Sequence, residues 1–241
     1  NGLVRGATQS FIPSASRRYD AALGWREFSQ IVVQCASTTT CNTAVDFINA
    51  ATGQVNLTLT KSVNAGAALG ANTKGGGDFD PNLYATALGN VWTGSVVVRS
   101  TNGTNLAVVA YSIRSGNNQA GGTSGATVQD GGIETFLPAV YQKNTQNVSC
   151  PSSDSAWTAF SLVRIQNPGT TNATNVDIYY FNLDGSQAFQ ELDRSVNAGK
   201  SLNRNMRVNC NEIPLGGNWT GSIYIRSDQP LVAVIENVWG S

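Results

Sequence analysis

The chain of 241 residues is 41% hydrophobic but only 12% charged, about half the charged share of an average globular protein. Its 15 Lys and Arg balance its 15 Asp and Glu, so we expect no strong field that would attract nucleic acid or an anionic membrane, and its short apolar runs argue against membrane insertion. Histidine is absent. Because this side chain most often carries general acid–base chemistry and binds transition metals, we expect neither an enzyme nor a cofactor.

Residues 1–10 are expected to form an N-terminal arm with Leu3 and Val4 as its apolar pair. Such an arm is either a frayed terminus or a strand that completes the open sheet edge of the next molecule, and the sequence leaves both open. A start at Asn1 without a leader fits a processed product whose signal has been removed, and a chain that was trimmed for another reason would look the same.

Residues 11–114 are expected to form a first module, because β-branched and aromatic residues alternate between Gly, Asn and Asp turns without helical periodicity. An opening strand after Phe11 and a short strand after the Asn64-Ala65-Gly66 turn complete the set. The other predicted strands are Phe28–Gln34, Ala44–Asn49, Gln54–Thr60, Gly94–Ser100 and Leu106–Ile113.

Within this module, Asp78, Asp80 and Asn82 place oxygen ligands at alternate positions, as at the start of many calcium loops. Leu83 stands where a complete loop would have Gly, so an Asx-rich turn is the alternative. We predict no metal site, with Ca²⁺ at these residues as the weak exception.

Residues 115–135 are rich in Gly, Ser and Asn and are expected to form a linker. It is either a flexible tether or an extended segment that lies against a neighbouring subunit, for which Ala126–Gln129 is suited.

Residues 136–241 are expected to form a second module, because motifs of the first module return in the same order. The segment Ser62–Gly66 returns as Ser195–Gly199, and Trp92–Ser95 returns as Trp219–Ser222. We expect an opening strand after Phe136 and a short strand after the Asn197–Gly199 turn. The other predicted strands are Ala159–Gln166, Asn175–Asn182, Gln187–Arg194, Gly221–Arg226 and Leu231–Val238. The fold predicted for the chain is therefore all-β, with two tandem Ig-like antiparallel β-sandwiches.

Four cysteines, Cys35, Cys41, Cys150 and Cys210, fall as one pair in each module. Of the three pairings that four cysteines allow, we expect disulfides Cys35–Cys41 and Cys150–Cys210, which favour a secreted or cell-surface protein. Zinc is the alternative, but the spacings and the absence of His do not suit it.

Four repeated tryptophans, Trp25, Trp92, Trp157 and Trp219, are expected to line the cores, with sugar stacking as the alternative for one of them. Trp239 has no repeat and stays undecided. Alternation predicts that Glu191, Asp193 and Glu236 face solvent, and no catalytic cluster is found. Two Asn-X-Ser/Thr sequons in predicted turns, at Asn102 and Asn172, are candidate glycosylation sites.

Three segments, Leu162–Gly169, Asn175–Ser186 and Pro230–Val234, resemble tandem β-sandwich modules in secreted and surface proteins of filamentous, mat-forming bacteria such as the Chloroflexi. The resemblance covers nearly the whole second module, whereas the first departs from it around Cys35 and Cys41 and near residues 71–90. It implies an extracellular structural or adhesive setting and no catalytic residues.

The first hypothesis is a non-enzymatic, secreted structural protein that self-assembles into a filament, pilus-like fibre or surface layer, with strand donation from the arm. The alternative is a carbohydrate- or surface-binding pair of modules from a larger secreted protein, with surface glycans as partners.

Overall fold

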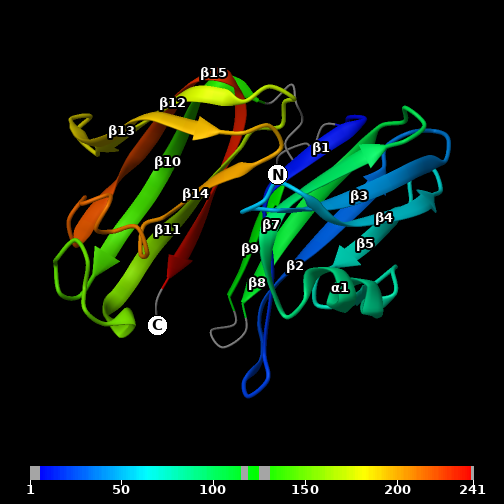
Figure 1. The fold of residues 1–241 in the computed structure, drawn as a ribbon, viewed down its shortest axis with the longest axis horizontal. Coiled ribbons are helices and arrows are strands. Elements are labelled where there is room, and N and C mark those ends of the chain that lie inside the picture. Colours follow the sequence, from blue (N-terminus) through cyan, green and yellow to red (C-terminus); the bar gives the residue numbers. More distant parts are fainter. Residues whose placement is uncertain (1–5, 115–118, 125–130, 240–241) are drawn as a thin grey trace. The chain divides into compact units, whose positions relative to one another are not determined.

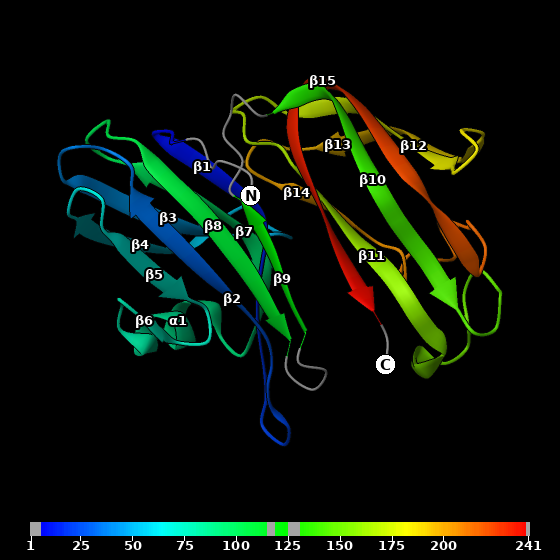
Figure 2. The same ribbon diagram turned by 180° about the vertical axis from the view of Figure 1, so that it is seen from behind.

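The computed structural model describes residues 6–114, 119–124 and 131–239. The chain divides into two compact units, Asn1–Asp130 (unit 1) and Gly131–Ser241 (unit 2), and both consist mainly of antiparallel strands (Figures 1 and 2). The predicted fold of two tandem antiparallel β-sandwiches is confirmed. In the part of the chain that is described, no helix is long and apolar enough to cross a membrane.

Unit 1 is a nine-stranded sheet that curls into two layers. One layer has the strand order β4-β3-β7-β1, and the other has the order β5-β2-β8-β9. Strand β1 joins them, because its residues from Gln9 to Arg18 pair with β7 and its residues from Arg17 to Asp20 pair with β2. The elements are β1 (Gln9–Asp20), β2 (Gly24–Cys35), β3 (Cys41–Asn49), β4 (Val55–Val63), β5 (Ala68–Asn72), β6 (Gly76–Gly77), α1 (Pro81–Leu88), β7 (Val91–Ser100), β8 (Leu106–Arg114) and β9 (Gln119–Ser124).

Unit 2 repeats this plan with six strands. The first half of β15 lies between β10 and β12, and its second half pairs with β11, so this one strand takes the places of both β7 and β8. The sequence had predicted two separate strands here. The elements are β10 (Gly132–Asn144), the 3-10 turn η2 (Asp154–Ala156), β11 (Trp157–Gln166), β12 (Ala173–Asn182), β13 (Gln187–Val196), β14 (Ser201–Asn205) and β15 (Asn218–Trp239).

The core of each unit lies between its layers, and it is formed by the residues of the long strands that point inward. Three of the four repeated tryptophans are buried as predicted, namely Trp92, Trp157 and Trp219. Trp25 is only half-buried, since it lies near the β1–β2 turn with the guanidinium of Arg17 4.7 Å from its ring. Trp239 is 53% exposed and contacts the ring of Tyr141 at 5.0 Å.

Helix α1 closes one end of unit 1 and was not predicted. Asp80 caps its first turn by accepting a hydrogen bond from Asn82 N, Pro81 occupies the first turn, and Gly89 ends it with φ 65°. Tyr84 and Leu88, four residues apart, turn toward the core. With only two buried positions, the helix leaves too short a periodic pattern for sequence analysis to detect.

The predicted arm and linker both contain residues that belong to the sheets. Ala7 exchanges two backbone hydrogen bonds with Leu106, and β1 begins at Gln9 rather than after residue 10. In the linker, residues 119–124 form β9 against β8, and β10 begins at Gly132. Leu3, Val4 and the segment Ala126–Gln129 lie outside the described residues.

Candidate functional site

Three aromatic rings stand in a row on the outer face of unit 2. Phe136 on β10 pairs with Tyr224 on β15, which pairs with Tyr179 on β12. Ring centroids are 4.7 Å apart for Phe136 and Tyr224 and 5.7 Å apart for Tyr179 and Tyr224, with interplanar angles of 22° in both pairs. These spacings are close to the roughly 4.8 Å between neighbouring strands, so the rings stack face to face across the sheet. We call this row the aromatic ladder.

Local alternation explains why the ladder forms. Leu137, Ile178 and Ile223, which adjoin the three rings in the sequence, are buried in the core of unit 2. Their neighbours must therefore point to the opposite face. The ladder was not predicted from the sequence, although each ring adjoins a core residue in its strand. Alternation assigns a side chain to one face of a sheet but does not show which strands are adjacent.

A row of charged groups lies beside the ladder. The Tyr224 hydroxyl donates a hydrogen bond of 2.7 Å to Glu134, which raises the pKa of Tyr224. Asp177 accepts a hydrogen bond of 2.8 Å from Arg226 and one of 3.3 Å from the Tyr179 hydroxyl. Burial alone would raise the pKa of Asp177, but its hydrogen bonds and the charge of Arg226 lower it. The aromatic ladder is thus flanked by charged side chains of both signs.

The ladder ends at the edge of a sheet. Strand β10 pairs with β15 along one side, and on its other side only Gln142, Lys143 and Asn144 pair, with β11. Among the described residues, no strand pairs with that other side of residues 132–141. Phe136 is 71% exposed at this edge. Its outer ring face is where a further strand or a flat ligand would be placed.

Unit 1 has no equivalent of the ladder among its described residues. Phe11 and Val97 form the pair that corresponds to Phe136 and Tyr224, and both are buried at 2% and 7% exposure. Asp46 stands opposite Val97 and forms an ion pair of 2.8 Å with Arg99. Among the described residues, the aromatic ladder is therefore a feature of unit 2.

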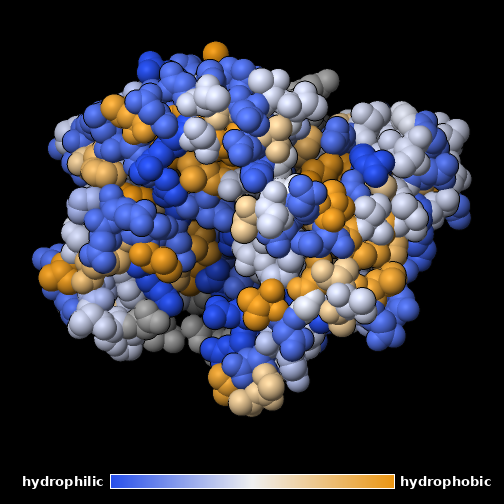
Figure 3. Space-filling model, in the orientation of Figure 1, coloured by the Kyte–Doolittle hydropathy of each residue, from blue (hydrophilic) through white to orange (hydrophobic). Residues whose placement is uncertain are grey.

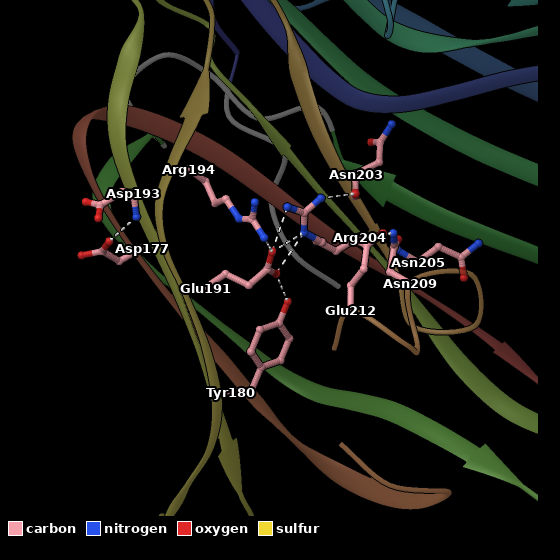
Figure 4. Close-up of polar contacts among 10 residues, drawn as sticks. All are labelled: Asp177, Tyr180, Glu191, Asp193, Arg194, Asn203, Arg204, Asn205, Asn209 and Glu212. Carbon is pink, nitrogen blue, oxygen red and sulfur yellow. Dashed lines mark hydrogen bonds and ion pairs between the residues drawn. The ribbon is translucent and has the colours of Figure 1, made fainter. Parts of the chain in front are cut away.

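A second polar arrangement in unit 2 is buried between its layers (Figure 4). Both carboxylate oxygens of Glu191 on β13 accept hydrogen bonds of 2.9 Å from Arg204 Nε on β14. The Tyr180 hydroxyl on β12 donates to the same carboxylate at 2.8 Å, and Arg194 pairs with it at 2.9 Å. Burial raises the pKa of Tyr180 most, and the charge of Glu191 adds to the effect. We call these residues the ionic cluster.

The prediction that Glu191 faces solvent is wrong, since it is 4% exposed. Asp193 has φ 53°, and the register places the four residues Glu191–Arg194 of β13 opposite the three residues Val176–Ile178 of β12. This β-bulge inverts the alternation counted back from the buried Val196. Asp193 is exposed, whereas Glu236 is partly buried.

The two predicted disulfides, Cys35–Cys41 and Cys150–Cys210, are confirmed. The first closes the turn between β2 and β3. The second connects the segment after β10 to the segment after β14, where the fully buried Met206 and Ile213 complete the core. Both bonds lie within their own units.

The residues of the weak calcium candidate serve the local fold instead. The carboxylate of Asp78 accepts a hydrogen bond of 2.7 Å from Gly70 N and pairs with Lys61 at 3.4 Å. Asp80 caps α1 through Asn82 N. Among the described residues, no group of three or more His, Cys, Asp or Glu side chains could hold a metal ion.

The two candidate glycosylation sites lie in exposed turns and form hydrogen bonds. Asn102 accepts from Asn42 N at 3.0 Å and donates through Nδ2 to Thr40 O at 2.9 Å. Asn172 accepts from Ala198 N at 2.9 Å. A glycan on Asn102 would therefore replace a hydrogen bond that holds its turn, and glycosylation of both residues stays a prediction.

No protein-family model and no curated protein matches the chain. Among solved structures, the Anabaena sensory rhodopsin transducer is 18% identical with a TM-score of 0.35, over 44% of this chain and 96% of its own. A Thermotoga maritima 1070 structure is 11% identical with a TM-score of 0.35, over 50% of this chain and 94% of its own. An infectious bursal disease virus Gx strain structure is 7% identical with a TM-score of 0.21, over 100% of this chain and 74% of its own. Similarities this low carry no argument about function.

Proposed function

We propose that this chain is a non-catalytic, extracellular structural protein that self-associates through the edge of β10 in unit 2. The observation that carries the proposal is the position of Phe136, the last ring of the aromatic ladder, at 71% exposure on that edge. The product of this association would be a filament, a pilus-like fibre or a surface layer.

A strand that joins β10 would satisfy the free backbone groups of the edge and extend the ladder. Directly opposed residues of antiparallel strands have Cβ atoms about 4.5–5.5 Å apart, so a side chain of the incoming strand would cover Phe136. Pro138 and the bulge at Ala139, which has φ 60°, hinder the addition of a strand along the part of the edge that follows residue 137. The contact therefore centres on residues 132–137.

The extracellular setting is supported by the two disulfides, which persist in oxidising compartments. The donor strand that we propose is the N-terminal arm of a second copy, with Leu3 and Val4 as its apolar residues. Both parts of the proposal extend the sequence hypothesis, including its resemblance to secreted bacterial surface modules.

The test compares the wild type with Phe136→Lys, because a lysine on an edge strand opposes the addition of another strand. The wild type should form assemblies in sedimentation velocity and negative-stain microscopy as its concentration rises, and F136K should remain monomeric with an unchanged melting temperature. Val91→Lys, at an equally exposed apolar strand position of unit 1, is the matched control and should assemble normally. A wild type that stays monomeric at high concentration contradicts the proposal.

The alternative is a carbohydrate- or surface-binding pair of modules. It is favoured by the exposed ring of Phe136 beside Glu134 and Arg226, since sugars stack on aromatic faces while charged groups bind their hydroxyls. In the ladder, Tyr224 covers one face of Phe136 and leaves the other for a sugar ring. Saturable binding of a polysaccharide by the monomer, lost in Phe136→Ala, would establish this alternative.

A further inference from the structure

The hairpin between β1 and β2 extends beyond the other strands of unit 1 (Figures 1 and 2). Tyr19 pairs with Trp25 and Asp20 with Gly24, so Ala21, Ala22 and Leu23 form the tip. All three tip residues are exposed, and Leu23 is 66% exposed. An apolar tip without a covering layer has a free-energy cost in water that contact with an apolar phase would remove.

The turn is fixed before any contact is made. Asp20 Oδ1 accepts hydrogen bonds of 2.8 Å from Ala22 N and 2.9 Å from Leu23 N, and these bonds lower the pKa of Asp20. Gly24 has φ 77°, which glycine adopts without strain. Because the tip is already ordered, little conformational entropy is lost when it binds.

Polarity changes in order along the hairpin. Behind the apolar tip stand two rings, Tyr19 at 37% exposure and the half-buried Trp25, with centroids 5.2 Å apart. Arg18 and Arg26 are exposed on the same two strands. In the space-filling view, the lowest part of unit 1, where Figure 1 places the end of the β1–β2 hairpin, is orange and tan, and hydrophilic atoms lie above it (Figure 3).

The charges of the hairpin are mostly basic. Asp20 is the only acid within residues 18–26, and the next acid, Glu27, pairs with Arg114 at 3.6 Å. The net charge of zero, from which we expected no attraction to an anionic membrane, describes the whole chain. Arg18 and Arg26 act locally, within a Debye length of about 8 Å at physiological salt.

We propose that the β1–β2 hairpin is a contact site for an anionic lipid surface. The tip would enter the interface, the two rings would lie at the level of the headgroups, and Arg18 and Arg26 would contact lipid phosphates. The order of apolar tip, aromatic rings and cations matches the order of hydrocarbon, interface and phosphate in a leaflet. A pocket of a protein partner would require no such order. The carboxylate of Asp20 limits entry to Ala21–Leu23, so the contact is peripheral and reversible.

The test is cosedimentation of the full chain with vesicles of phosphatidylcholine alone and of phosphatidylcholine mixed with phosphatidylserine. The wild type should bind the mixed vesicles and lose this binding at high salt. Leu23→Asp should reduce the partition coefficient at least tenfold, whereas Leu23→Trp should raise it. Replacing Arg18 and Arg26 together by Gln should remove the preference for phosphatidylserine.

The matched control is Leu183→Asp, at the 81% exposed tip of the β12–β13 hairpin in unit 2. It should bind vesicles as the wild type does. Failure of the wild type to bind mixed vesicles, or an equal loss in L23D and L183D, overturns the proposal. If L23D changes only the sedimentation of the protein without vesicles, the tip contacts a second copy and the proposal is also wrong. Vesicle binding by the hairpin of unit 1 and self-association through the β10 edge of unit 2 are tested separately. F136K, which changes only the β10 edge, should bind the mixed vesicles as the wild type does.

Discussion

Glu191 and Arg204 connect the two layers of unit 2 at the place where unit 1 has Leu59 and Ala71. Glu191 stands opposite Ile178 as Leu59 stands opposite Val45, and Arg204 stands opposite Val163 as Ala71 stands opposite Ile31. The equivalent of Tyr180 is Phe47, which contacts Tyr84 of α1 at 5.8 Å. The same fold therefore closes this end with an apolar plug in one unit and with an ionic cluster in the other.

We expect single substitutions in the ionic cluster to destabilise the protein strongly. Glu191→Gln leaves the guanidinium of Arg204, 9% exposed, without its counter-charge, which costs about 3–5 kcal/mol for a buried pair. The triple variant Tyr180→Phe, Glu191→Leu, Arg204→Met converts the cluster to an apolar set and should recover most of that loss. Urea denaturation of the whole chain measures both.

Substituting Arg194 provides the control for this experiment. Its side chain is 45% exposed although it also pairs with Glu191, so Arg194→Gln should cost less than about 1 kcal/mol. If the triple variant is as unstable as Glu191→Gln, the cluster contributes favourable energy beyond charge compensation, and our account of it is wrong.

The strands were the part of the fold that the sequence predicted well, because alternation records which residues face a core. The predicted segments Ala44–Asn49 and Asn175–Asn182, for example, lie within β3 and β12. Alternation carries no information on a bulge. Because of the bulge at Asp193, Glu191 faces the core and not the solvent as predicted. The local signals of α1, a capping Asp80 followed by Pro81, were present but equally fit a turn.

The sites depended on features that are not local. The disulfides were predictable because four cysteines in two modules allow few pairings. The aromatic ladder required the order of strands β10, β15 and β12, which are far apart in the sequence. The ionic cluster required knowing that β13 and β14 form the facing edges of two layers. Neither relationship follows from residue patterns within one strand.

Unit 1 should lose stability in alkali through Tyr84. Burial raises the pKa of Tyr84 from 10.0 to about 12, so the neutral phenol is favoured in the folded state. The contribution of Tyr84 to the free energy of unfolding is complete below pH 10 and is lost as the pH rises from 10 toward 12. Tyr84→Phe keeps the ring and should weaken the decline in melting temperature between pH 9 and pH 11. The melting temperature of Tyr111→Phe, a substitution at an exposed tyrosine of β8, should decline with pH as that of the wild type does.

The two disulfides should contribute unequally, because loop-closure entropy grows with the length of the loop. Cys150–Cys210 spans 60 residues and Cys35–Cys41 spans 6, so we expect losses of about 4 and about 2 kcal/mol on removal. Each cysteine pair is replaced by serines, and urea denaturation of the whole chain gives the two losses. Equal losses would mean that chain entropy is not the main source of the stabilisation.

Two truncations separate the role of the N-terminal arm in assembly from its role in unit 1. Removal of residues 1–5 deletes Leu3 and Val4 and leaves the pairing of Ala7 with Leu106 in place. If the arm is the donor strand, this variant should melt as the wild type does but form no assemblies in negative-stain microscopy. Assemblies of normal appearance would show that the donor lies elsewhere in the chain.

Removal of residues 1–10 should also destabilise unit 1. It deletes the two backbone hydrogen bonds between Ala7 and Leu106 at 2.9 and 2.8 Å and the one from Ser100 N to Thr8 O at 2.8 Å. It also removes the first two residues of β1, including Ser10, which is 1% exposed. At about 1 kcal/mol for each hydrogen bond, the loss should be about 3 kcal/mol or more. Equal melting temperatures of the two truncated chains in calorimetry would contradict the assignment of residues 6–10 to the sheet of unit 1.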